Sequence, residues 1–147
     1  MSTYKHILIA IDLTESAELV IRKAQELAVS NATTMTVIHA IDYIPYMGFG
    51  ENALITPTYT IPNEELVSNA KQPIEQILKK LGLDNLEVVY LFGRAANEIV
   101  QYADDNNVDL IVLGSHGRHG VKLLLGSTAN AVLHHASCDV LAVRVKE

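Results

Sequence analysis

Apolar residues in this chain follow two alternating patterns, which predict two kinds of secondary structure. Short runs rich in Val, Ile and Leu predict strands buried on both faces. Between these runs, apolar residues recur every three or four positions, as on one face of an amphipathic helix. The expected strands are Tyr4–Ile11, Thr34–Ile41, Leu86–Leu91, Val108–Leu113 and Val140–Val145, and the expected helices cover Ala17–Ala28, Asn63–Leu81, Ala96–Ala103 and Ala129–Ala136.

The alternation of strands and helices predicts the fold class. It favours a five-stranded, mostly parallel sheet with helices on both faces and right-handed crossovers. We therefore expect residues 1–147 to form a single, doubly wound, Rossmann-like α/β domain. Only Asp42–Pro62 lacks a sustained period, and it contains three prolines and two glycines. We expect a mobile loop there, for which a lid, a dimer contact and a simple flexible excursion all remain open.

Local signals suggest where the helices begin and end. Thr14 or Ser16 is suited to cap the first helix through its hydroxyl group. Pro73 lies within the second helical pattern, so the helix either bends there or has its firm part begin there. Gly82 is a plausible end of that helix, because glycine tolerates the left-handed conformation that often follows a helix.

A glycine-rich segment follows the fourth expected strand. Gly114, Gly117 and Gly120 are spaced by three, and Gly126-Ser127-Thr128 then opens the last helical pattern. A strand, a glycine loop and a helix N-terminus together favour phosphate binding, because glycine permits close approach and the helix supplies free N–H groups. The spacing matches neither the Walker pattern nor the dinucleotide fingerprint. A plain surface loop remains the alternative.

The fold class also predicts where a ligand would bind. In open parallel sheets, ligands bind beyond the carboxyl ends of the strands, where the strand order reverses. If the first strand is central and the fourth lies beside it, Asp12 and the glycine segment meet there, with Ala40 of the second strand beside them. Asp12 would then lie near a ribose, the phosphates or a bound Mg²⁺. Taken alone, Asp12 is better explained as a plain turn residue before a helix.

Composition and charge exclude several classes of partner. The net charge is −6 and no basic block occurs, so we expect neither nucleic acid nor an acidic membrane surface as a partner. The only cysteine, Cys138, cannot form an internal disulfide, and a cytoplasmic location is the natural expectation. The first residues lack the features of a signal peptide. Cys138 itself is expected to be a small core residue.

Other reactive residues provide weaker evidence for chemistry. The loop residues His116, Arg118 and His119 could contact phosphate oxygens or could simply be solvated. His6 and His39 fall within expected strands and are interpreted as structural, and the adjacent pair His134-His135 does not share a helix face. We find no arrangement of a nucleophile with a base and no zinc-binding spacing, so the sequence identifies no catalytic residue.

These segments together resemble the universal stress protein (UspA-like) family over essentially the whole chain. The matching pieces are YKHILIAID, VIHAID, VDLIVLGSHGR and LLLGSTANAVLHHASCDVLAVRV. The ATP-binding branch of that family carries two glycines separated by two residues, then nine residues, then Gly-Ser/Thr. Here Gly114 and Gly117 are followed by eight residues and then Gly126-Ser127. The resemblance implies an adenine nucleotide alpha hydrolase-like fold.

The resemblance also implies a ligand, contact residues and an assembly. The ligand would be ATP or another adenine nucleotide, with or without Mg²⁺, and the assembly would be a homodimer formed through the C-terminal strand Val140–Val145. The implied nucleotide contacts are Asp12, Ala40, Gly114, Gly117, Gly126, Ser127 and Thr128.

Three functions remain open at the level of the sequence. The first is a nucleotide-binding regulatory protein of the stress response. The second is a dimeric scaffold with an empty crevice, which the shorter glycine segment would favour. The third is a weak ATPase, for which the sequence identifies no base or nucleophile.

Overall fold

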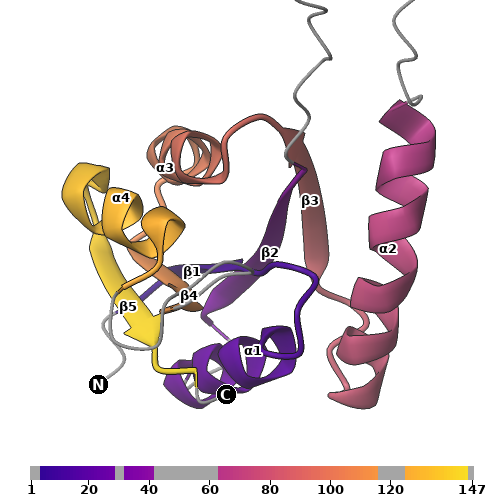
Figure 1. Cartoon of the computed structure of the whole chain (residues 1–147). Helices are drawn as coiled ribbons and strands as arrows, with labels where there is room; N and C mark the ends of the chain where they lie inside the picture. Colours follow the sequence, from indigo (N-terminus) through magenta and orange to yellow (C-terminus); the bar gives the residue numbers. More distant parts are fainter. Residues whose placement is uncertain (1–3, 29–31, 42–62, 116–124, 146–147) are drawn as a thin grey trace, which may run out of the picture.

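A parallel sheet forms the centre of the molecule and confirms the predicted fold class (Figure 1). The computed structural model describes residues 4–28, 32–41, 63–115 and 125–145. Within these ranges, five strands lie in the order β3-β2-β1-β4-β5, and each neighbouring pair is parallel. The elements are β1 (His6–Ala10), α1 (Ala17–Leu27), β2 (Thr34–Ile41), α2 (Asn63–Lys80), β3 (Glu87–Phe92), α3 (Ala95–Asp105), β4 (Leu110–Gly114), α4 (Ser127–His135) and β5 (Asp139–Val143).

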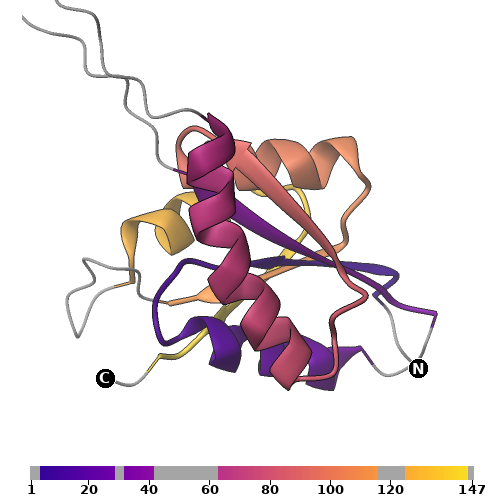
Figure 2. The same cartoon turned by 90° about the vertical axis from the view of Figure 1, so that its right-hand side faces the viewer.

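Two hydrophobic clusters cover the two faces of the sheet. Ile7 and Ile9 of β1 pack on one face with residues of α1 and α2, whereas Leu8 and Ala10 pack on the other with α3 and α4. Figure 1 shows α1 below the sheet and α3 and α4 above it, and Figure 2 shows α2 passing in front of β3. Since successive strand residues point to opposite faces, a strand covered on both sides needs a continuous apolar run.

The central strands provide the most completely buried part of the core. The side chains of β1 and β4 are flanked by a neighbouring strand on each side and by helices above and below. Ile7, Leu8, Ile9, Ile111 and Val112 are 0% exposed. Full burial of such a side chain stabilises the fold by about 1.5 to 3 kcal/mol. The two central strands are therefore a firm base for the loops that leave their carboxyl ends.

Helix α2 resolves the ambiguity at Pro73. The helix is continuous from Asn63 to Lys80 with Pro73 inside it, so it does not begin at the proline. Gly82 follows with φ of +71°, and the N–H of Leu83 donates to the carbonyl of Leu78 at 2.8 Å. This left-handed residue and its bond close the helix as the sequence predicted.

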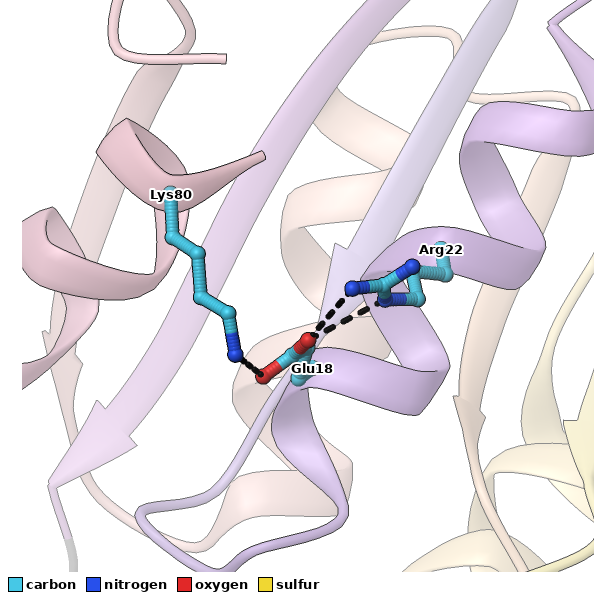
Figure 3. A network of polar contacts seen from close by, with 3 residues as sticks. All are labelled: Glu18, Arg22 and Lys80. Atoms are coloured by element: carbon cyan, nitrogen blue, oxygen red, sulfur yellow. Dashed lines mark hydrogen bonds and ion pairs between the residues drawn. The ribbon is translucent and has the colours of Figure 1, made fainter. Parts of the chain in front are cut away.

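An ion network joins α1 to α2 on the surface (Figure 3). Glu18 accepts bonds from Arg22 of its own helix at 2.7 Å and from Lys80 of α2 at 3.1 Å. The hydrogen bond from Arg22, followed by that from Lys80, lowers the pKa of the Glu18 carboxyl. Both basic side chains are more than half exposed, so water and salt weaken the attraction. The network orients the two helices more than it stabilises them.

Several local expectations differ from the structure. Ser16 occupies the N-cap position of α1 but makes no side-chain cap bond, so the expected hydroxyl cap is wrong. The apolar residue Leu133 of α4 is 45% exposed, because this short helix buries only a narrow stripe that includes Ala129 and Val132. The expected loop Asp42–Pro62, which connects β2 to α2 in the chain, lies outside the described residues.

Candidate functional site

The candidate site lies where the chain reverses its direction across the sheet. From β1 the chain builds outward to β2 and β3, then returns to place β4 on the other side of β1. Ala10 of β1 is paired with Leu113 of β4 at the carboxyl ends of the two strands. The residues that follow, Ile11-Asp12 and Gly114-Ser115, therefore leave the sheet next to one another. The expected strand order is confirmed, and such switch points are where open parallel sheets bind ligands.

Backbone and side-chain bonds fix the β1 side of this site. The N–H of Ile11 donates to the carbonyl of Ile38 at 3.0 Å, which extends the pairing with β2 beyond the end of β1. Nδ1 of the buried His39 lies 3.0 Å from the carbonyl oxygen of Ile11 and so acts as the donor. His39 is therefore a structural histidine, as predicted, and it immobilises the residue that precedes Asp12.

Asp12 forms the core of a small turn that leads into α1. Its carboxylate oxygen Oδ1 accepts a bond from the N–H of Thr14 at 3.1 Å and another from the Thr14 hydroxyl. The Thr14 and Ser16 hydroxyl oxygens are 2.6 Å apart. The side chain of Asp12 is half-buried at the edge of the sheet. The interpretation of Asp12 as a turn residue is thus correct, and it is compatible with a role in ligand binding.

The two ends of the glycine segment are joined on the β4 side. Gly114 is the last residue of β4, and the N–H of Ser115 donates to the carbonyl of Val143 in β5 at 2.8 Å. The N–H of Gly126 then donates to the carbonyl of Ser115 at 2.6 Å. Gly117, together with the rest of 116–124, lies outside the described residues. The segment with one residue fewer than usual therefore still brings Gly114 and Gly126 close together.

Helix α4 begins directly at this closure. Gly126 precedes it in an extended conformation, with φ of −60° and ψ of 153°, and Ser127 and Thr128 form its first turn. The first helical bond runs from the N–H of Asn130 to the carbonyl of Gly126 at 2.9 Å. The N–H groups of the first turn come before this bond and therefore have no acceptor within the helix. The positive end of the helix dipole lies at the same place. Because any residue can adopt the φ of Gly126, a left-handed backbone is not the reason for glycine there.

Ala40 completes a row of candidate positions across three neighbouring strands. It lies near the carboxyl end of β2, half-buried and paired with Leu91 of β3. Asp12 follows β1, and the Gly114 and Gly126 closure follows β4. Neighbouring strands are about 4.8 Å apart, so the row spans about 10 Å. The structure thus brings six of the seven predicted contact residues to one edge of the sheet, and the seventh is Gly117.

The remaining reactive side chains have structural explanations. His6 places Nε2 2.9 Å from the Thr36 hydroxyl oxygen and Nδ1 3.2 Å from the carbonyl of Asn106, at the amino end of the sheet. Burial, followed by the charge of Asp104, raises the pKa of the Cys138 thiol, so the unreactive protonated form is favoured. His134 and His135 are both exposed. His6 and Cys138 are structural as predicted.

The sequence did not identify Thr14 and Ser16 as residues that act together with Asp12. Thr14 and Ser16 were considered as helix caps, yet the Thr14 hydroxyl donates to the Asp12 carboxylate and the Ser16 hydroxyl contacts that of Thr14. The spacing Asp-x-Thr-x-Ser is compatible with such a turn, because short polar side chains often bond to residues two positions away.

In the part of the chain that the structure describes, no helix combines the length and apolar character of a membrane span.

Comparison with known proteins identifies relatives over the whole length of the chain. The model of the universal stress protein family matches residues 3–144. Universal stress protein A homolog 1 of Coxiella burnetii is 40% identical over 144 residues, which cover 98% of this chain and 99% of the relative.

Solved structures show the same fold. Universal stress protein UspA from Lactobacillus plantarum superposes with a TM-score of 0.76 at 25% identity, over 96% of this chain and 98% of that one. A universal stress protein from Archaeoglobus fulgidus, in complex with dAMP, gives a TM-score of 0.61 at 25% identity, over 99% of this chain and 100% of that one.

Proposed function

Because this chain belongs to the universal stress protein family, we propose that it is a regulatory protein of the stress response that binds an adenine nucleotide, with ATP as the first candidate. The observation that supports the proposal most directly is the closure between Ser115 and Gly126. It brings the glycine segment and the N-terminus of α4 to the carboxyl edge of β4, beside Asp12. The dAMP complex of the Archaeoglobus fulgidus relative supports the class of ligand.

The row of candidate positions suits the parts of a nucleotide. The base would lie near the backbone of Ala40, the ribose near Asp12, and the phosphates at Gly114, Gly117, Gly126, Ser127 and Thr128. The distance of about 10 Å from β2 to β4 is comparable to the length of a nucleoside with its first phosphate. First-turn N–H groups and the positive dipole end of α4 suit an anion. A Mg²⁺ ion would bind between the phosphates and a carboxylate such as that of Asp12.

The assembly and the location belong to the same proposal. We expect a homodimer in which the edge strand β5 pairs with its copy, because an exposed strand edge offers unpaired N–H and carbonyl groups. Val140, Leu141 and Ala142 of β5 are only half-buried in the single chain. Sedimentation at increasing concentration measures this association. A cytoplasmic location agrees with the single cysteine, and fractionation of cells tests it.

The first experiment identifies the ligand. The purified protein is denatured, and the supernatant is separated on a nucleotide-resolving column, which reports the base and the number of phosphates. Calorimetric titrations with ATP, ADP, AMP and adenosine follow, each with and without Mg²⁺. We expect saturable binding that strengthens with phosphate number, because the additional phosphates would extend along the positive end of α4.

A pair of matched variants locates the site. Asp12→Ala removes the carboxylate at the carboxyl edge, whereas Asp84→Ala removes an exposed carboxylate in the loop before β3, at the opposite end of the sheet. Asp12→Ala should weaken nucleotide binding about tenfold or more, as expected for a lost charge-assisted hydrogen bond. Asp84→Ala should bind as the wild type does. If both variants bind equally well, the proposed site is wrong.

The dimeric scaffold is distinguished by the same titrations. A protein that is folded, dimeric and stable but shows neither heat of binding nor thermal stabilisation at millimolar ATP has no nucleotide site. That result would replace the proposed function with the scaffold.

A further inference from the structure

The turn after β1 contains a chain of hydroxyl groups that ends at Asp12. The single hydroxyl proton of Thr14 is donated to Oδ1 of Asp12. The Ser16 hydroxyl oxygen is 2.6 Å from the Thr14 hydroxyl oxygen, and only Ser16 has a proton left to donate in that contact. The bonds therefore run in one direction, from Ser16 to Thr14 to Asp12, and such chains strengthen each bond within them.

This arrangement differs from a hydroxyl cap at the start of a helix. Ser16 is the N-cap residue of α1, a position at which serine normally accepts a bond from the first turn and stabilises the helix. Here Ser16 has helical angles, with φ of −74° and ψ of −15°, and makes no cap bond through its side chain. The Thr14 hydroxyl donates to Asp12 instead, and the Ser16 hydroxyl contacts that of Thr14. Helix stability alone therefore does not explain the pair.

The bonds restrict which part of the carboxylate can serve a ligand. Oδ1 accepts both the N–H and the hydroxyl of Thr14, so its two lone pairs are occupied. A carboxylate held in this way offers Oδ2 for further contacts and disfavours bidentate binding of a cation. The backbone below it is held as well, because Ile11 is bonded to Ile38 and to His39.

We propose that Thr14 and Ser16 are positioning residues that orient the Asp12 carboxylate so that Oδ2 accepts a hydrogen bond from a ligand donor such as a ribose hydroxyl. This role rests on the proposed nucleotide site. Thr14 and Ser16 do not touch the ligand in this scheme, and they act through Asp12. Loss of the Thr14 hydroxyl leaves Oδ1 with only the N–H of Thr14 as a donor. The carboxylate is then less firmly oriented, so part of the binding energy is spent on ordering it.

The test is a double-mutant cycle in nucleotide binding. Thr14→Val keeps the branched shape and the backbone N–H but removes the hydroxyl, and we expect it to weaken ATP binding about tenfold. Thr14→Ser restores the hydroxyl and should bind within about twofold of the wild type. Thr34→Val, at the amino end of β2, is the matched control and should leave the affinity unchanged. Thermal unfolding of each variant verifies that it is folded.

The cycle separates positioning from a structural role. If Thr14 acts through Asp12, the double variant Thr14→Val/Asp12→Ala binds no more weakly than Asp12→Ala alone. If the two losses multiply, or if Asp12→Ala weakens binding while Thr14→Val does not, the positioning role is overturned and the nucleotide site stands. A folded wild type that binds no nucleotide overturns the proposed function instead, and the positioning role with it. Ser16→Ala should show a smaller loss of the same kind, and an unchanged affinity would exclude Ser16 from the chain.

Discussion

Adding a negative charge at the start of α4 should have opposite effects on stability and on nucleotide binding. Ser127 is the first residue of the helix and is exposed, and the first turn of α4 has no acidic residue. Aspartate there complements the helix dipole and should stabilise the fold by about 0.3 to 1 kcal/mol. For a domain of this size, that gain raises Tm by about 1 to 3 °C.

The same charge should repel a bound phosphate. Two like charges about 5 Å apart in water-exposed surroundings repel by about 1 kcal/mol, which weakens binding about fivefold for each nearby phosphate charge. Calorimetry should therefore show no loss of affinity for adenosine, a loss for AMP and a larger loss for ATP. High salt should reduce the loss, because mobile ions screen exposed charges.

Two further variants make the result interpretable. Ser127→Ala removes the hydroxyl without adding charge. Its loss of nucleotide affinity is subtracted from the loss measured for Ser127→Asp, which leaves the effect of the charge. Ser68→Asp introduces the same charge on the exposed surface of α2 and should leave nucleotide affinity unchanged. The reasoning is refuted if Ser127→Asp binds ATP as well as Ser127→Ala does, or if it weakens adenosine as much as ATP.

Two other predictions concern stability. Asp109→Asn should lower the free energy of unfolding by about 1 to 3 kcal/mol in urea, because the two carboxylate oxygens accept backbone N–H groups at 2.7 and 2.9 Å and an amide NH₂ cannot replace one of them; Asp84→Asn is the control, and an equal effect of both would contradict the explanation. Glu18→Gln should cause a small loss of stability at neutral pH that salt reduces. Since the pKa of Glu18 is lowered in the folded state, its contribution is present above the pKa of the unfolded chain and is lost as the pH falls through the folded value. A difference between wild type and Glu18→Gln that grows in acid would therefore be inconsistent with the network.

Local patterns along the chain were sufficient to predict the elements and their order. Thr34–Ile41 was predicted with both of its bounds, because a strand covered on both faces has a nearly continuous apolar run, which is visible here towards the end of TMTVIHAI. Gly82 was identified as a helix end, since few other residues tolerate its φ of +71°. The alternation of strands and helices then restricted the fold to a parallel, doubly wound sheet.

The candidate site was predictable in part for a related reason. On the condition that the first strand is central and the fourth lies beside it, Asp12 and Gly114 were expected at one edge of the sheet, and the observed strand order meets that condition. The functional use of that edge rests on the proposal and its experiments. The family resemblance also came from the sequence, and the match over residues 3–144 confirms it.

Tertiary contacts decided what individual polar side chains do. Thr14 and Ser16 have the composition of a helix cap, but the Thr14 hydroxyl donates to the charged Asp12 carboxylate and the Ser16 hydroxyl contacts that of Thr14. Asp109 is only an interruption in an apolar run until β4 pairs with β1, where its carboxylate binds the N–H groups of Lys5 and His6, about 100 positions earlier in the chain.

The division has a simple physical origin. Burial of a strand or helix depends on how its apolar residues are spaced, and that spacing can be read directly from the amino-acid sequence. A hydrogen bond depends on a single partner at about 3 Å, and for residues distant in sequence that partner exists only after the chain has folded. The sequence alone therefore determined the sheet, its helices and the edge at which the candidate residues lie, whereas the folded structure decided how Asp12 is held there.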